Sequence, residues 1–236
     1  MFRAALNNDA GVTMSMRVSL YRIGILCGLV APVLWAAAII VCGSLRPGYS
    51  HVARYISELG ERGGSTEFLM RYAGFVPAGI LHVLFAGSLY EALKGDRLAP
   101  APALLLALNG LGRVAAGMFP CEAGCAGSRV LLSQKLHTLA AGVGFFSLIG
   151  ASIVVGVILR RRGLGKMSAY SIISGLLGLI FLLLMTWGAE PRAGTGLYER
   201  LSSGLLSLWV LVLAGRLWYP GPSDRGALFR NLSPRG

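Results

Sequence analysis

Charged residues are scarce in this chain: Asp, Glu, Lys and Arg make up 14% of its 236 residues, whereas 55% are hydrophobic and the mean hydropathy is +0.66. So few polar residues cannot cover the surface of a soluble domain, and the composition therefore excludes an ordinary soluble protein. The sequence also lacks a P-loop, a dinucleotide-binding glycine fingerprint, an HExxH motif and a nucleophile elbow. None of the common nucleotide, metalloprotease or α/β-hydrolase signatures is present.

Six long apolar runs explain why charged residues are so few in this chain. Each is close to the ~20 residues that a helix needs to cross a hydrocarbon core about 30 Å thick. We predict spans at Leu20–Cys42, Arg71–Leu93, Pro100–Phe119, His137–Leu159, Ala169–Gly188 and Leu201–Tyr219. The runs lack the alternation of barrel strands, so the predicted fold class is all-α, an integral membrane bundle of about six transmembrane helices. The first run is longer than the apolar core of a signal peptide, and we expect it to be retained.

The regions outside the runs are short and polar. We therefore expect a disordered N-terminal tail over residues 1–19, a transmembrane domain over residues 20–219 and a basic tail over residues 220–236. Both tails are expected to be cytoplasmic.

The distribution of basic residues sets the expected topology. The net charge is +12, and thirteen of the 22 Lys and Arg residues lie in the tails and in the second and fourth connections. Eight lie in the first, third and fifth connections. The positive-inside rule then places both termini in the cytoplasm of a multi-pass protein of the cell (cytoplasmic or inner) membrane. The basic patches suit a lipid bilayer with anionic headgroups, and no nucleic-acid partner is expected.

A cysteine pair stands in "GMFPCEAGCAGSR", which this topology places outside the cytoplasm. A turn can bring Cys121 and Cys125 within disulfide distance, and the compartment permits oxidation. Free thiols are one alternative and a metal site is another, although Cys-x-x-x-Cys supplies only half of a zinc site. Cys27 and Cys42 lie in the first run and are interpreted as small apolar residues.

The first outer connection contains "SHVARYISELGERGG", which shows helical periodicity. Val52, Tyr55, Ile56 and Leu59 share one face, and most of the polar residues lie on the other. Ser50 can cap the start, and glycines end the pattern at Gly60. We predict a short amphipathic helix in the outer interface, covering the bundle.

The third run carries the one basic residue expected inside a helix, Arg113. An ionised side chain in a span is costly, so it faces the bundle or reaches an interface. Asn109 lies one turn away on the same face, and His82 on the second run is at a similar depth. We expect a carboxylate to neutralise Arg113, and we favour Glu122 over Glu58.

Polar residues from four parts of the chain fall at the same depth. The candidate ligand-binding residues are Ser57, Glu58, Arg113, Glu122, His137, Glu199 and Arg200, with His51 nearby; His82 and Asn109 are the membrane-embedded polar pair. Together they predict a polar vestibule in the outer third of the bundle.

Four segments, "RYISELG", "FPCEAGC", "LHTLAAG" and "LYERL", resemble the domain-of-unknown-function 998 membrane proteins, over roughly Leu20 to Tyr219. That family often has Asp where this chain has Glu58 and Glu122, a change that keeps the carboxylate. The resemblance implies a six-helix bundle and a place for the polar cluster, but no reaction.

Three classes of function fit these residues. The first is the binding or movement of a polar small molecule or lipid headgroup, with Arg113 or Arg200 contacting an anion. A structural or accessory membrane subunit is the second. The third is a metal-dependent intramembrane hydrolase, for which His82 and His137 are the candidate ligands. With three histidines and no paired motif, the sequence favours binding over an enzyme and predicts no resident metal or cofactor.

The charge distribution gives a topology that can be tested directly. Cysteines introduced near Gly64 and near Gly194 should react with a membrane-impermeant thiol reagent in intact cells, and a cysteine near Gly163 should not. Labelling of the Gly163 site alone would invert the topology.

Overall fold

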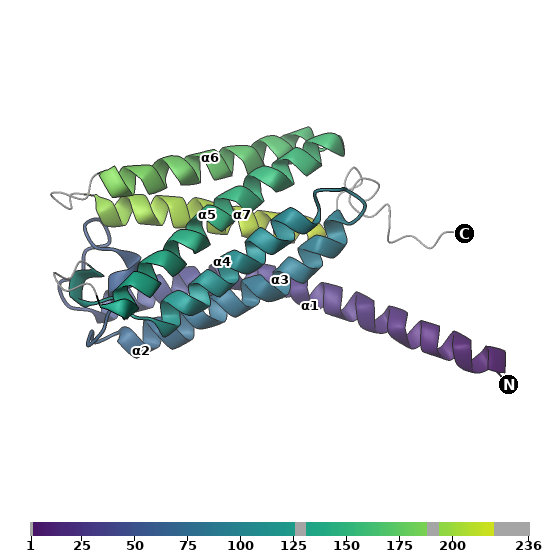
Figure 1. Cartoon of the computed structure of the whole chain (residues 1–236), viewed down its shortest axis with the longest axis horizontal. Helices are drawn as coiled ribbons and strands as arrows, with labels where there is room; N and C mark the ends of the chain where they lie inside the picture. Colours follow the sequence, from purple (N-terminus) through teal and green to yellow (C-terminus); the bar gives the residue numbers. More distant parts are fainter. Residues whose placement is uncertain (1, 126–130, 188–193, 220–236) are drawn as a thin grey trace.

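The computed structural model describes residues 2–125, 131–187 and 194–219, with side chains from Val18 onward. Every regular element in these ranges is helical (Figure 1). In chain order they are α1 (Phe2–Leu45), the 3-10 helix η1 (Ile56–Gly60), α2 (Glu67–Leu69), the π-helix η2 (Met70–Phe75), α3 (Val76–Leu93), α4 (Pro100–Met118), the 3-10 helix η3 (Ala123–Cys125), α5 (Leu132–Arg161), α6 (Gly165–Trp187) and α7 (Thr195–Trp218).

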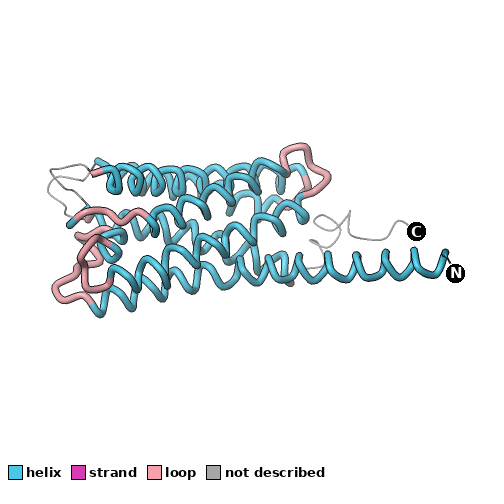
Figure 2. The backbone as a smooth tube through the Cα atoms, turned by 60° about the horizontal axis from the view of Figure 1, so that its bottom comes forward, coloured by secondary structure: helices cyan, strands magenta, loops and turns pink. Residues whose placement is uncertain are grey.

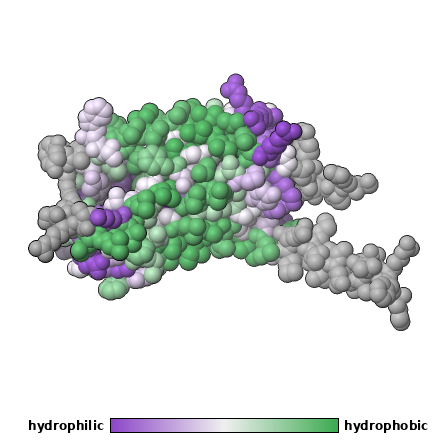
Figure 3. Space-filling model, viewed as in Figure 1, coloured by the Kyte–Doolittle hydropathy of each residue, from purple (hydrophilic) through white to green (hydrophobic). Residues whose placement is uncertain are grey.

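Six helical stretches of the described chain are long and apolar enough to cross a membrane. They are Val18–Leu45, Glu67–Leu93, Pro100–Met118, Leu132–Arg161, Gly165–Trp187 and Thr195–Trp218. The six predicted spans are therefore confirmed, with ends displaced by a few residues; the predicted end at Gly188 lies outside the described residues. On the face seen in Figure 3, the middle of the bundle is apolar and polar residues lie towards both ends. The chain is a multi-pass membrane protein.

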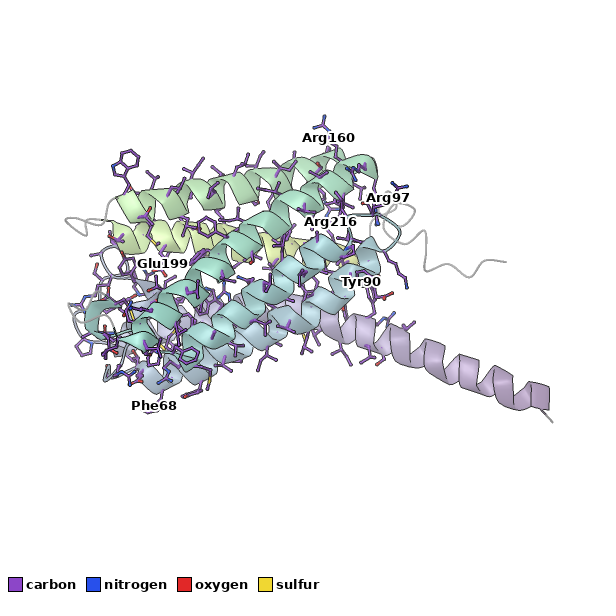
Figure 4. The ribbon with its side chains drawn as sticks, in the orientation of Figure 1. Phe68, Tyr90, Arg97, Arg160, Glu199 and Arg216 are labelled. Atoms are coloured by element: carbon purple, nitrogen blue, oxygen red, sulfur yellow. A yellow bond between two sulfur atoms is a disulfide. The ribbon has the colours of Figure 1, made fainter. Side chains whose placement is uncertain are left out.

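The six spans form a ring in sequence order. Helix α1 packs on α3, each later long helix packs on the next, and α7 returns to α1. The connections lie at the two ends of the bundle (Figure 2). One end holds η1, α2 and η3 and is called the capped end. The other end carries Arg97, Arg160 and Arg216 (Figure 4).

Two tryptophans organise the interior at different depths. Trp209 on α7 is fully buried in the larger apolar cluster and donates a hydrogen bond to Ser171 Oγ at 3.0 Å. Trp35 on α1 belongs to a second cluster nearer the capped end and donates to Ser203 Oγ at 3.0 Å. Each indole N–H therefore has an acceptor in a neighbouring helix, as a buried donor requires.

Helices α3 and α4 meet backbone to backbone. A Cβ on Gly79 would lie 2.4 Å from Gly110 O, and a Cβ on Gly110 would lie 2.5 Å from Gly79 O. Small residues at such a crossing let two membrane helices approach closely. The crossing also sets the position of Arg113, one turn further along α4.

Two expected segments differ from the structure. Residues 2–19, for which we predicted a disordered tail, continue α1 as helix; the predicted tail over residues 220–236 lies outside the described residues. The predicted amphipathic helix is replaced by the five-residue η1, in which Glu58 is buried, while Val52 of the expected apolar face is 53% exposed. Contacts of Ile56 and Arg54 with α7, described below, outweigh the local helical periodicity.

Glycine substitutions test the crossing of α3 and α4. Gly79→Ala should lower the thermal unfolding temperature in detergent, because overpacking a tight contact costs about 1–3 kcal/mol. Gly87→Ala on the same helix is the matched control, since nothing lies within 4 Å of its added Cβ; it should leave stability unchanged or raise it. Equal effects of the two substitutions would contradict the close crossing.

Candidate functional site

The loop that follows α1 folds back over the end of the bundle, and we call residues 46–66 the cap segment. Two of its apolar side chains anchor it, because Ile56 and Leu59 are 1% and 0% exposed. They pack in the cluster that contains Trp35. A backbone held this far from water needs partners for its polar groups, and side chains from other elements supply them.

Helix α7 provides the first set of partners. The amide of Ile56 donates to Glu199 Oε2 at 2.6 Å, and the amide of Leu197 donates to Val52 O at 2.9 Å. The guanidinium of Arg200 donates to Arg54 O at 2.9 Å and to the Tyr49 hydroxyl at 2.5 Å. Figure 4 shows Glu199 near the capped end. The first turns of α7 therefore hold residues 49–56 of the cap segment.

Arg200 also acts electrostatically on two rings of the cap segment. Burial raises the pKa of Tyr49 to about 12, although Arg200 opposes this rise by favouring the phenolate. Burial, with Arg200 as a second cause, lowers the pKa of His51. His51 Nδ1 accepts a hydrogen bond from Arg200 Nε at 3.2 Å. Near neutral pH both rings are uncharged, so Arg200 is the fixed charge in this part of the site.

The loop between α4 and α5 provides the second set of partners. Glu61 Oε2 accepts the amide of Gly124 at 2.5 Å, while Glu61 Oε1 forms an ion pair with Arg46. The amide of Arg62 donates to Cys121 O at 2.9 Å. Cys121 and Cys125 are joined by a disulfide that encloses η3. The cap segment and this loop are thus connected by backbone and side chain together.

A serine of the cap segment contacts a histidine of α5. His137 Nε2 lies 3.0 Å from Ser57 Oγ, and His137 Nδ1 lies 2.9 Å from Phe119 O and 3.1 Å from Ala116 O. Both carbonyl oxygens can only accept, so Nδ1 carries the ring proton and donates to them. Nε2 is then the acceptor for the Ser57 hydroxyl. The helix begins at Leu132 rather than at His137, which places the histidine inside α5, where it is 4% exposed.

Arg113 does not pair with Glu122, contrary to our expectation. Glu122 Oε1 accepts from Arg62 Nε at 3.2 Å, towards the surface. The Arg113 guanidinium instead lies over the ring of Trp35, 4.3 Å from its centroid, a cation–π arrangement. Its Nε is buried and has no hydrogen-bond partner among the described residues. Helix α4 turns this side chain towards α1 and α7, and Glu199 is the carboxylate that acts on it electrostatically.

His82 and Asn109, the membrane-embedded polar pair, are in contact, in agreement with the similar depth predicted for them in the membrane. His82 Nδ1 lies 2.6 Å from Asn109 Oδ1, and Asn109 Nδ2 donates to Gly144 O at 2.8 Å. His82 and Asn109 therefore connect α3, α4 and α5. Within the described ranges, no three His, Cys, Asp or Glu side chains gather as metal ligands, and His82 and His137 each have a protein partner.

Two hollows lie near the cap segment. The cap pocket, with a volume of about 420 Å³, is lined by Arg46, Ala53, Arg54, Glu58, Glu61 and Gly124. The bundle cavity, of about 40 Å³, has a mainly apolar lining that includes the rings of Trp35, Phe75 and Phe145. Its polar lining residues are Ser57, Asn109, Arg113, Glu199 and Ser203.

Four of the seven predicted ligand-binding residues line one of the two hollows. Glu58 lines the cap pocket; Ser57, Arg113 and Glu199 line the bundle cavity, which Asn109 also reaches. Arg200 and His137 hold the cap segment, and Glu122 lies at the surface. The predicted site residues did not include four that line the hollows: Trp35, Arg46, Arg54 and Glu61. The position of Arg46 soon after the first apolar run could have indicated that it belongs to the site. Trp35 gave no such signal, because the sequence does not distinguish a buried tryptophan inside a span from a lipid-facing one.

Comparison with known proteins identifies one family. A model of the family described as "Protein of unknown function (DUF998)" matches residues 29–216, from within α1 almost to the end of α7. No curated protein and no solved structure matches the chain. The match includes both hollows and all the residues that line them.

Substitution of Glu199 tests how the cap segment is held. Glu199→Ala leaves the buried Ile56 amide without an acceptor, which should cost about 1–3 kcal/mol and speed hydrogen exchange in residues 52–60. Glu199→Gln keeps an acceptor oxygen and should have a smaller effect. Glu91→Ala, which removes a solvent-exposed pair with Lys94, is the control. Unchanged exchange in Glu199→Ala would show that the segment is held without this bond.

Proposed function

Because the chain belongs to the DUF998 family, whose function is unknown, we propose from its own geometry that it binds a polar small molecule or a lipid headgroup in the cap pocket. The observation that carries this proposal is the environment of the Arg54 side chain. Its side chain lines a pocket of about 420 Å³ and makes no hydrogen bond or ion pair with any described residue. The volume lies within the range of small-molecule sites.

The charges around the pocket favour a ligand with an anionic group. Arg46 and Glu61 neutralise each other, and the carboxylate of Glu58 accepts the amide of Tyr55 at 3.1 Å. Arg54 is left as the cation available to a phosphate or carboxylate, groups that a guanidinium binds with two parallel hydrogen bonds. The nearby carboxylates favour a ligand that also carries an ammonium or hydroxyl group.

Exposed aromatic side chains support a position at headgroup depth. Phe68 and Tyr72 stack with ring centroids 6.2 Å apart and are 71% and 49% exposed at the capped end. Trp187, the last residue of α6, is 92% exposed at the same end. Aromatic rings of this kind gather at the membrane–water interface. With the topology inferred from charge, the pocket opens at the level of the outer leaflet headgroups.

A structural or accessory role is the main alternative, and ligand-dependent stability distinguishes the two. In detergent, phosphatidylglycerol, phosphatidylethanolamine or inorganic phosphate at saturating concentration should raise the thermal unfolding temperature of the wild type. A ligand at 100 times its Kd adds about 2.7 kcal/mol. Stabilisation by the two lipids alone identifies a headgroup, and stabilisation by phosphate alone identifies a soluble anion.

The Arg54→Ala variant should lose this stabilisation while remaining as stable as the wild type without ligand. Arg62→Ala is the matched control, because Arg62 lies on the same connection, is exposed and does not line the pocket. It should respond to the ligand as the wild type does. Equal responses of the two variants would contradict a specific role for Arg54, and a wild type that responds to none of the three probes would favour the structural role.

A further inference from the structure

We propose that Ser57 is a nucleophile activated by His137, and that the bundle cavity accepts the acyl group of a carboxylic ester. The inference goes beyond ligand binding in the cap pocket and does not depend on it. It rests on three features that meet at one place: the Ser57–His137 contact, the fixed tautomer of the histidine and the unsatisfied Nε of Arg113.

The contact has the arrangement that a serine nucleophile requires. A serine hydroxyl is a weak nucleophile unless an adjacent base takes its proton, and that base must be oriented by a third group. His137 Nε2 lies 3.0 Å from Ser57 Oγ, within the distance for direct proton transfer. The carbonyls of Phe119 and Ala116 take the place of the usual carboxylate, because they accept the Nδ1 proton and leave Nε2 free to act as the base.

The cavity next to Ser57 supplies the remaining requirements. Ser57 and Arg113 both line it, and the buried Arg113 Nε–H has no acceptor in the part of the chain that the structure describes. A cationic donor in such a site stabilises an oxyanion. The rest of the lining is mainly apolar, including Phe75 and Phe145, and suits a hydrocarbon chain. At about 40 Å³ the cavity has room for about one water molecule, so an acyl group enters only when lining side chains move, and the shortest acyl groups need the least movement.

The reaction balances with water as the only co-reactant. Ser57 Oγ bonds to the carbonyl carbon as its proton passes to His137 Nε2, and the carbonyl electron pair moves to oxygen beside Arg113. Collapse of this oxyanion breaks the bond to the alcohol oxygen, which leaves with the proton from Nε2. Water then attacks the acyl-serine and gives a proton to Nε2; collapse releases the carboxylic acid, and Ser57 Oγ recovers the proton.

Covalent labelling tests the nucleophile without a known substrate. Purified protein in detergent should gain one adduct from a small fluorophosphonate, and peptide mass spectrometry of the wild type should place it on Ser57. Ser57→Ala should show no adduct. Ser152→Ala is the matched control, because Ser152 is a buried serine that donates to Ile149 O on its own helix and lies outside the cavity; it should be labelled as the wild type is.

The His137→Gln variant separates activation from a purely structural hydrogen bond. Glutamine can accept from Ser57 and donate to the carbonyls, but it is not a base at neutral pH. It should unfold near the wild-type temperature and yet be labelled at least about 100-fold more slowly, as expected for loss of a general base. Labelling at the wild-type rate in this variant, or no Ser57 adduct in folded wild type, would overturn the proposal.

Two substrates distinguish the sources of the ester. p-Nitrophenyl acetate represents a soluble ester, and phosphatidylglycerol in mixed micelles represents a membrane lipid. Release of p-nitrophenolate or of fatty acid that depends on Ser57 supports the proposal and identifies the source. Failure of both esters to acylate Ser57 would refute the acyl-transfer step even if the fluorophosphonate reacts.

Discussion

The bond between the Ile56 amide and the Glu199 carboxylate is the interaction on which the capped end depends. Ile56 is separated from Glu199 by 143 positions along the chain, and the bond length is 2.6 Å. It allows a segment with several polar side chains to lie over the apolar interior, because the buried amide is satisfied. The cap segment in turn contributes to two hollows of different character: the cap pocket, which has charged lining residues, and the bundle cavity, whose lining is mainly apolar.

The composition and the apolar runs were sufficient to predict the fold. Hydropathy is a local property, so each span was found from its own residues, and the contact between His82 and Asn109 followed from counting depth along two antiparallel helices. Span ends were less accurate: the second helical stretch begins at Glu67, four residues before the predicted start at Arg71, because Glu67 pairs with Arg71 at 2.5 Å and can stay in the helix.

The side-chain partners in the site could not be predicted in the same way. Arg113 needed compensation for its charge, and the sequence offered Glu122 as the adjacent carboxylate. The rotation of α4 directs the arginine to Trp35, on a helix more than seventy residues earlier in the sequence. Similarly, the periodicity around Ile56 predicts an amphipathic helix, but bonds from Glu199 and Arg200 hold this stretch as a short 3-10 turn within an extended segment. Both outcomes depend on contacts between distant elements, which a single sequence does not specify.

The closure of the ring has a consequence for how the protein is made. Helix α1 leaves the ribosome first and α7 last, yet they pack on each other, and the cap segment is held by residues of α7. Until α7 enters the membrane, one side of α1 faces lipid, and the amide of Ile56 lacks the acceptor it has in the finished bundle. The capped end is therefore assembled after synthesis of the last helix. A chain truncated before α7 would insert five spans without forming either hollow as the complete protein has it.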